Sequence, residues 1–214
     1  MEQNNEIRAN VAAIREKMAE AARSCGRDPQ EIKLCAATKM NDAARVKEAV
    51  AAGVDCCGEN RVQELTAKLA QNAYDGAPVH FIGHLQTNKV KYLIGNVSLI
   101  HSVDSLPLAE EISEQSEKKG LVTDVLAEIN IGKEPTKSGF SAEQAEDAMD
   151  KISSLPGIRA VGLMAMLPKS ENSRYLSDLC LQMRAIYDTI KKEGFPVRYL
   201  SMGMSEDYRI AIRN

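Results

Sequence analysis

A lysine follows directly on the first short apolar run of the chain. Residues 33–38 read Lys-Leu-Cys-Ala-Ala-Thr, and Lys39 comes next. A run without polar alternation is typical of a strand buried on both faces of a parallel sheet. A lysine at the end of that strand can lose the water around its ammonium group, which favours the neutral amine that forms an imine with an aldehyde. The alternative interpretation is a solvated lysine that begins a loop.

A turn of small residues follows the last apolar run, in the sequence Ser201-Met-Gly203-Met-Ser205. Hydroxyl groups and free backbone N–H groups at the start of a helix form a cup for a phosphate group. Ser205 alone would also be an ordinary N-cap. A lysine across the mouth of a barrel from a phosphate cup suggests pyridoxal phosphate, because its aldehyde needs the amine and its phosphate needs the cup.

Asn60 closes another apolar run, in the sequence Gly58-Glu-Asn60-Arg61. Its amide offers both a hydrogen-bond donor and an acceptor, which suits a ligand held at the ends of the strands. The alternative is an N-cap for the helix that begins next. Both roles are compatible with this position.

Two histidines, His80 and His84, occur where a third apolar run turns into a helix. Backbone N–H groups at such a turn are free to bind an anion. The two histidines have no companion acid or cysteine in register, so they are too few for a zinc site. The sequence therefore predicts no metal site.

The elements that must position these residues alternate between short apolar runs and amphipathic helices. The opening helix has one apolar stripe at spacings of three and four, formed by Ile7, Val11, Ile14, Met18 and Ala22. Seven strands are predicted at about residues 33–38, 54–58, 79–82, 97–101, 124–131, 159–166 and 197–202. Helices are predicted after the first strand up to about Ala52, from about Arg61, after Gln86, and at about 106–118, 142–153 and 175–192.

Strands that are each followed by a helix predict an α/β protein with a parallel sheet. A TIM-type (β/α)8 barrel leaves no edge strand unpaired, so we favour it, with the eighth strand missing from a sequence that stops at Asn214. An open doubly wound sheet is the alternative. No linker or low-complexity tract divides residues 1–214, so we expect a single domain.

Composition and charge exclude several classes of protein. Hydrophobic residues make up 44% and charged residues 27%, as in globular proteins. The net charge of -3 and the aromatic content of 4% argue against nucleic-acid binding. The sequence shows no export signal and no apolar run long enough for a membrane span. Five cysteines, two of them adjacent, indicate reduced thiols, so we expect a cytoplasmic protein.

Several motifs together resemble one family. They are Thr38-Lys39, GENRVQE from Gly58, HFIGHLQTNK from His80, KSG at Lys137 to Gly139, GLMAM from Gly162 and LSMGMSEDYRIAI from Leu200. Their order over nearly the whole chain is similar to that of the pyridoxal phosphate homeostasis proteins. That family in turn resembles the N-terminal barrel domain of alanine racemase and continues into an eighth strand with an Arg-x-Gly motif.

The resemblance implies a role for each candidate residue. Lys39 would bind pyridoxal phosphate as an imine, Ser201 and Gly203 would hold the phosphate, and Asn60 would lie beside the ring. The implied function is cofactor binding and delivery to apo-enzymes by a monomer or weak dimer, without robust catalysis. A racemase needs acid/base groups on both faces of its substrate, and the related enzymes take the second from another domain. The alternative is a Schiff-base enzyme, either an amino-acid racemase or a lysine-dependent aldolase.

Overall fold

A single parallel sheet organises the protein, whose residues 2–214 are described by a computed structural model. The seven strands are β1 (Cys35–Ala37), β2 (Cys56–Glu59), β3 (Val79–Phe81), β4 (Leu99–Val103), β5 (Thr123–Glu128), β6 (Ile158–Met164) and β7 (Tyr199–Ser201). They lie side by side in chain order and every neighbouring pair is parallel. All carboxyl ends therefore meet at one edge of the sheet, where ligands bind in folds of this kind.

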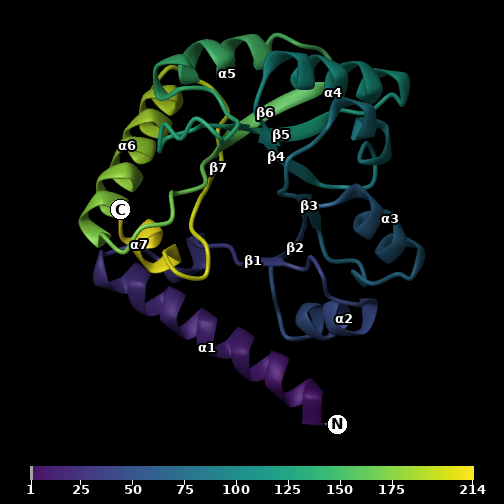
Figure 1. The fold of residues 1–214 in the computed structure, drawn as a ribbon, viewed down its shortest axis with the longest axis vertical. Helices are drawn as coiled ribbons and strands as arrows, with labels where there is room; N and C mark the ends of the chain where they lie inside the picture. Colours follow the sequence, from purple (N-terminus) through teal and green to yellow (C-terminus); the bar gives the residue numbers. More distant parts are fainter. Residues whose placement is uncertain (1) are drawn as a thin grey trace.

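Helices cover the outer face of the curved sheet (Figure 1). They are α1 (Glu2–Ser24), α2 (Ala43–Ala51), α3 (Val62–Ala70), α4 (Leu106–Lys118), α5 (Ala145–Ser153), α6 (Ser173–Lys192) and α7 (Tyr208–Arg213), with short 3-10 helices η1 (Pro29–Glu31), η2 (Thr87–Tyr92) and η3 (Ala142–Gln144). The seven predicted strands are confirmed. The helix predicted after Gln86 is a 3-10 helix of six residues, Thr87–Tyr92.

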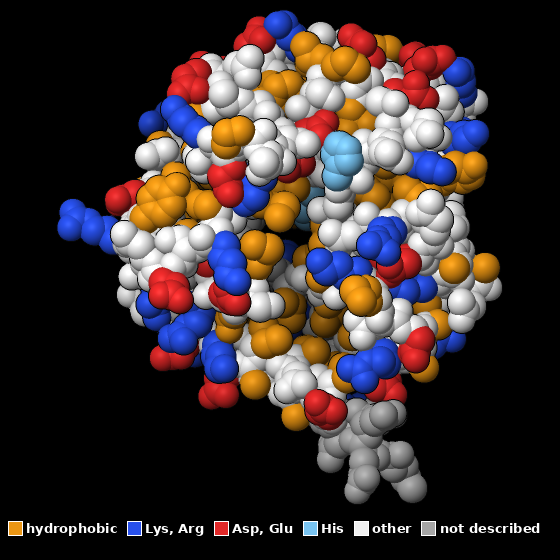
Figure 2. Space-filling model, in the orientation of Figure 1, with side chains coloured by type: hydrophobic (Ala, Val, Ile, Leu, Met, Phe, Trp, Pro, Cys, Tyr) orange, Lys and Arg blue, Asp and Glu red, His pale blue; other side chains and the backbone are white. Residues whose placement is uncertain are grey.

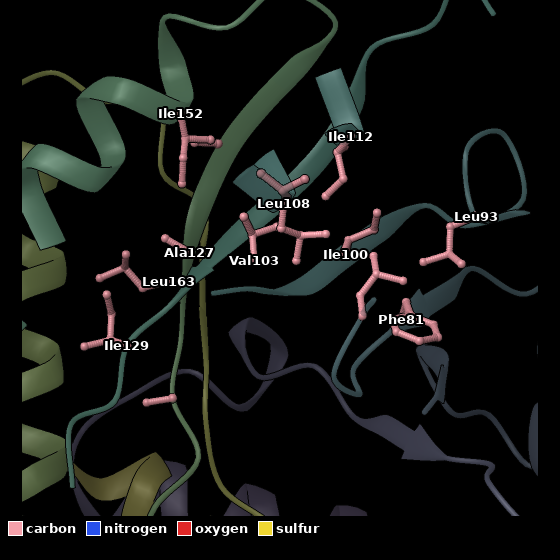
Figure 3. Close-up of a cluster of buried hydrophobic side chains, with 14 of the residues drawn as sticks. Phe81, Leu93, Ile100, Val103, Leu108, Ile112, Ala127, Ile129, Ile152 and Leu163 are labelled. Atoms are coloured by element: carbon pink, nitrogen blue, oxygen red, sulfur yellow. The ribbon is translucent and has the colours of Figure 1, made fainter. Parts of the chain in front are cut away.

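The main hydrophobic core fills the layer between the sheet and the helices. Phe81, Ile100 and Leu163 of the strands pack there with residues of the helices, such as Leu108 and Ile152 (Figure 3). The opposite, concave face carries a smaller apolar cluster of Leu99, Leu126, Val161 and Met164. The sheet is therefore buried on both faces, as the apolar runs predicted.

The two edge strands, β1 and β7, are not paired with each other within residues 2–214. Helices α1 and α7 pack together beside this edge, where Met18 and Ala22 bury the side chain of Ile212. The Arg27 guanidinium donates a hydrogen bond of 2.9 Å to the carbonyl oxygen of Ile212. The fold is thus the predicted α/β type, a curved parallel sheet of seven strands covered by helices. No helix of the described chain has the length and hydropathy needed to cross a membrane.

Candidate functional site

Lys39 lies in the turn that follows β1, at the carboxyl edge of the sheet. Its neighbour Met40 has a φ of 60°, a left-handed conformation that is uncommon outside glycine. The Met40 N–H donates a hydrogen bond of 2.8 Å to Glu64 Oε2, and this bond holds the pKa of Glu64 below its usual value. The expected desolvation of Lys39 is wrong: the residue is exposed, because β1 is an edge strand with a neighbour on one side only.

A buried network fixes the backbone on the other side of Lys39. Glu59 Oε1 accepts hydrogen bonds from Thr38 Oγ1 at 2.6 Å and from Lys68 Nζ at 2.7 Å. Lys68 Nζ also donates to the carbonyl oxygen of Thr38 at 2.7 Å. Tyr74 donates to the same Glu59 oxygen at 3.2 Å, and burial together with the charge of Glu59 raises the pKa of Tyr74. The backbone on both sides of Lys39 is thus anchored, while the residue itself is exposed.

Asn60 follows β2 at the same edge. Its side-chain oxygen Oδ1 is buried and has no hydrogen-bond partner within residues 2–214. A Cβ atom on Gly83 would lie 2.5 Å from the Asn60 carbonyl oxygen, so only glycine permits this close approach of the neighbouring loop. The N-cap of α3 is Arg61, so the alternative role of Asn60 as that cap is wrong. A buried acceptor without a partner suits a ligand that donates a hydrogen bond.

Ser201 ends β7 and is linked to two histidines. Its Oγ lies 2.9 Å from His101 Nδ1, and His101 Nε2 lies 2.9 Å from His80 Nδ1. Burial, and to a lesser extent the charge of His80, lowers the pKa of His101 to about 3. His101 is therefore a neutral imidazole at physiological pH, with one donor and one acceptor nitrogen. His101 was not predicted as a site residue, although it is the last residue of the strand predicted at 97–101; in the structure it lies in the middle of β4.

Gly203 lies in the loop between β7 and α7 with a φ of 93°. A Cβ atom there would lie 2.8 Å from Tyr208 Cα, so glycine is needed for the loop to pass close to the helix. The Met204 N–H donates to the carboxylate of Asp207, which is the N-cap residue of α7. Ser205 is exposed in the turn and does not cap the helix, so that alternative is wrong.

His80 has cysteine companions, contrary to the expectation from sequence. One ligand atom each of Cys35, Cys56 and His80 lies within 4.8 Å of the others. The Cys35 thiol and burial raise the pKa of the Cys56 thiol well above its usual value, while His80 opposes that shift. His84 is not part of the group, since its Nδ1 lies 3.2 Å from Asp104 Oδ2. All five cysteines are free thiols, as predicted.

Glu128, the last residue of β5, was also missed. Burial first, and then the charge of Asp104 after β4, raise the pKa of Glu128 to about 7, while Lys137 opposes the shift. The signal that could have found Glu128 is the one used for Lys39, a charged residue closing an apolar strand. Figure 2 shows that this face of the molecule is hollowed near its centre, with hydrophobic side chains and a histidine beside the hollow.

The sequence matches a known family over nearly its whole length. The family described as alanine racemase, N-terminal domain, matches residues 5–212. The chain is 37% identical over 203 residues to the pyridoxal phosphate homeostasis protein of Aquifex aeolicus, covering 94% of this chain and 89% of that protein. It is 35% identical over 212 residues to the protein of the same name from Escherichia coli K12, covering 97% of this chain and 90% of that protein.

A solved structure supports the same relationship. The structure of PipY from Synechococcus elongatus PCC7942, with PLP (pyridoxal phosphate) bound, superposes with a TM-score of 0.77 at 30% identity. The match covers 91% of this chain and 92% of that one. With a family match over most of its length and relatives above 30% identity, the chain belongs to the alanine racemase N-terminal domain family, among the pyridoxal phosphate homeostasis proteins.

Proposed function

We propose that this protein binds pyridoxal phosphate covalently through Lys39, limits the free aldehyde in the cell and delivers the cofactor to enzymes that need it. The observation that carries the proposal is the fixed turn around Lys39 at the edge of the sheet that also carries Ser201 and Gly203. The names of the relatives, and the PLP bound in PipY, support the same cofactor.

The residues present fit the cofactor. Asn60 Oδ1 is a buried acceptor that needs a donor, and Ser201 keeps hydrogen-bonding capacity beyond its bond to His101. Gly203 lets the loop before α7 pass close to the helix, since a Cβ atom there would meet Tyr208. When bound, the cofactor supplies an aldehyde carbon that a lysine amine can attack.

Each residue then has a distinct task. Thr38 and Met40 hold the base of Lys39 in place, so its flexible side chain samples a limited region near the edge of the sheet. Ser201 and the N–H groups around Gly203 orient the phosphate, and Asn60 holds the ring. Exposure of Lys39 suits a carrier, since the bond to the cofactor must also be reversible and open to exchange.

We place the protein among carriers rather than enzymes. The relatives are named for homeostasis and not for a reaction. We further propose that residues 1–214 form one domain that works as a monomer or weak dimer in the cytoplasm, where five free thiols remain reduced. A Schiff-base enzyme of the racemase or aldolase type is the competing function, and turnover separates the two.

The test is a titration of the purified protein with pyridoxal phosphate, followed by visible absorbance of the lysine-bound cofactor. We expect the absorbance in the wild type and in Lys33→Ala, an exposed lysine just before the same strand that serves as a matched control, and none in Lys39→Ala. The loaded protein should reactivate apo-enzymes. Racemisation of alanine at about 1 per second or faster, the low end of ordinary enzymes, would instead identify an enzyme.

A further inference from the structure

Three side chains with soft or borderline donor atoms meet on the inner face of the sheet. Cys35 and Cys56 are register partners on β1 and β2, and His80 lies on β3. Cys57 and Phe81 pack in the core layer under the helices. Because successive residues of a strand point to opposite faces, Cys56 and His80 point into the concave side. Their ligand atoms and Cys35 Sγ lie within 4.8 Å of one another.

The geometry points to a Zn²⁺ site formed by Cys35, Cys56 and His80. In tetrahedral zinc sites the ligand atoms lie about 3.5 Å apart, so small side-chain rotations would close this group around an ion. Two thiolates and an imidazole select a soft or borderline metal such as Zn²⁺ over Mg²⁺ or Ca²⁺. With three protein ligands, the fourth position is left for water.

Charge and space both favour this ion. Binding forms two Zn–S bonds and breaks two S–H bonds, and the two protons pass to the buffer. The dication and two thiolates are together neutral, which avoids an unpaired charge inside the sheet. A Cβ atom on Gly58 would lie 3.0 Å from Cys35 Sγ, so glycine at this position leaves the thiol free to turn.

One ring nitrogen of His80 is already hydrogen-bonded, as the non-coordinating nitrogen of a metal-binding histidine usually is. His80 Nδ1 lies 2.9 Å from His101 Nε2, which leaves Nε2 of His80 for the metal. A metal on Nε2 requires a proton on Nδ1, and this N–H must donate to His101 Nε2. Because Nε2 of His101 then accepts this bond, its ring proton lies on Nδ1, which donates to Ser201 Oγ.

Metal binding would therefore set the direction of the Ser201 hydroxyl. When Ser201 accepts from His101, its own proton points elsewhere and can bind an anion. This coupling rests on the proposed phosphate role of Ser201, whereas the metal site itself does not. Zn²⁺ should tighten the binding of pyridoxal phosphate and leave that of pyridoxal, which has no phosphate, unchanged.

The test is Zn²⁺ binding by the reduced, cofactor-free chain, measured by metal analysis after dialysis and by competition with a chromophoric chelator. We expect one Zn²⁺ per chain. Cys35→Ser should lose more than the roughly 10- to 100-fold in affinity that an outer-shell change costs. Cobalt substitution should give thiolate charge-transfer absorbance that Cys35→Ser removes.

Two matched controls protect the interpretation. Cys57 is next to Cys56 but its side chain faces the helices, so Cys57→Ser should keep the metal. Cys25→Ser removes an exposed thiol and should keep it too. Circular dichroism shows whether each variant is folded. Zn²⁺ binding that survives Cys35→Ser, no binding by the reduced wild type, or a Cys35–Cys56 disulfide as the only reaction of these thiols would overturn the site.

Titrations of pyridoxal phosphate and pyridoxal with and without Zn²⁺ test the coupling. In the wild type, we expect Zn²⁺ to raise the binding affinity for pyridoxal phosphate but not that for pyridoxal. In Cys35→Ser, we expect no such increase. Equal effects on both ligands would overturn the coupling. Zn²⁺ binding without any cofactor binding would refute the proposed function and leave the metal site standing, so the two failures are distinguishable.

Discussion

Ser201 offers a direct test of phosphate recognition at the scale of one hydroxyl. A hydrogen bond to a charged group contributes about 1.5–3 kcal/mol, so Ser201→Ala should bind pyridoxal phosphate roughly tenfold or more weakly. Unphosphorylated pyridoxal should hardly change. Fluorescence or calorimetric titration of both ligands gives the comparison, with the exposed Ser205→Ala as a matched control. Equal losses for the two ligands would mean that Ser201 has a structural role.

Glu128 makes stability depend on pH. Its pKa is about 7 in the folded protein against 4.5 for the unfolded chain, so the folded state keeps this proton to higher pH. Stability from this group is therefore complete below pH 4.5 and is lost as pH rises towards 7. At about 1.4 kcal/mol per pKa unit, ionisation of Glu128 lowers the free energy of unfolding by about 3 kcal/mol in total once the pH is well above 7.

Glu128→Gln removes this loss. We expect its free energy of unfolding to equal that of the wild type near pH 4.5 and to exceed it at pH 8, as measured by urea denaturation. Asp104→Asn should lower the pKa of Glu128, because Asp104 raises it, so the loss of stability should be smaller and should be complete at a lower pH. Parallel curves for wild type and Glu128→Gln between pH 4.5 and 8 would contradict this prediction.

Single residues at strand ends could be predicted from the sequence, but contacts between side chains of different strands could not. Lys39, Asn60 and Ser201 were found because each closes an apolar run, and all three lie at the predicted edge. The link from His80 to His101 and the approach of Cys35 to Cys56 depend on which residues pair across strands. A sequence gives strand positions within a few residues, and a shift of one residue turns a side chain to the other face.

At the scale of elements, the buried Lys68–Glu59 pair joins α3 to β2 and to the end of β1. Lys68→Met would leave Glu59, which is fully buried, with an unpaired charge. Breaking such a pair costs about 3–5 kcal/mol, so chemical denaturation should show a loss of this size. The double variant with Glu59→Gln should recover part of it, because the uncompensated charge is then gone.

An exposed pair of the same type is the control. Lys151 and Asp147 form an i, i+4 pair on the surface of α5. Such pairs contribute about 0.3–0.5 kcal/mol, so Lys151→Met should be nearly neutral. Similar losses for Lys68→Met and Lys151→Met would show that the network beside Lys39 does not hold β1, β2 and α3 together.

Strands could be predicted where both of their faces are buried, and helices where buried residues recur with the helical period. The apolar runs gave all seven strands, and the stripe from Ile7 to Ala22 gave α1. The segment after Gln86 was predicted as a helix and forms the short 3-10 helix η2 instead. Neither composition nor periodicity could give the packing of α1 on α7, because that contact joins the two ends of the chain.

At the scale of the whole molecule, the fold brings together residues that are far apart in the sequence. Chain order and strand order are the same, so Lys39 and Ser201 belong to opposite edge strands of one sheet. Curvature of the sheet turns both edges towards the side where α1 packs on α7 (Figure 1). The two ends of the chain thus lie at the side of the molecule where we propose the cofactor site.

The most direct test of this account maps the cofactor on the entire chain. The loaded protein is reduced with borohydride, digested and examined by mass spectrometry, which surveys every lysine in one measurement. We predict one reduced adduct per chain, located on Lys39, and its loss in Lys39→Ala with the secondary structure retained. A stoichiometric adduct on another lysine, with Lys137 the first to examine, and undiminished affinity in Lys39→Ala would contradict it.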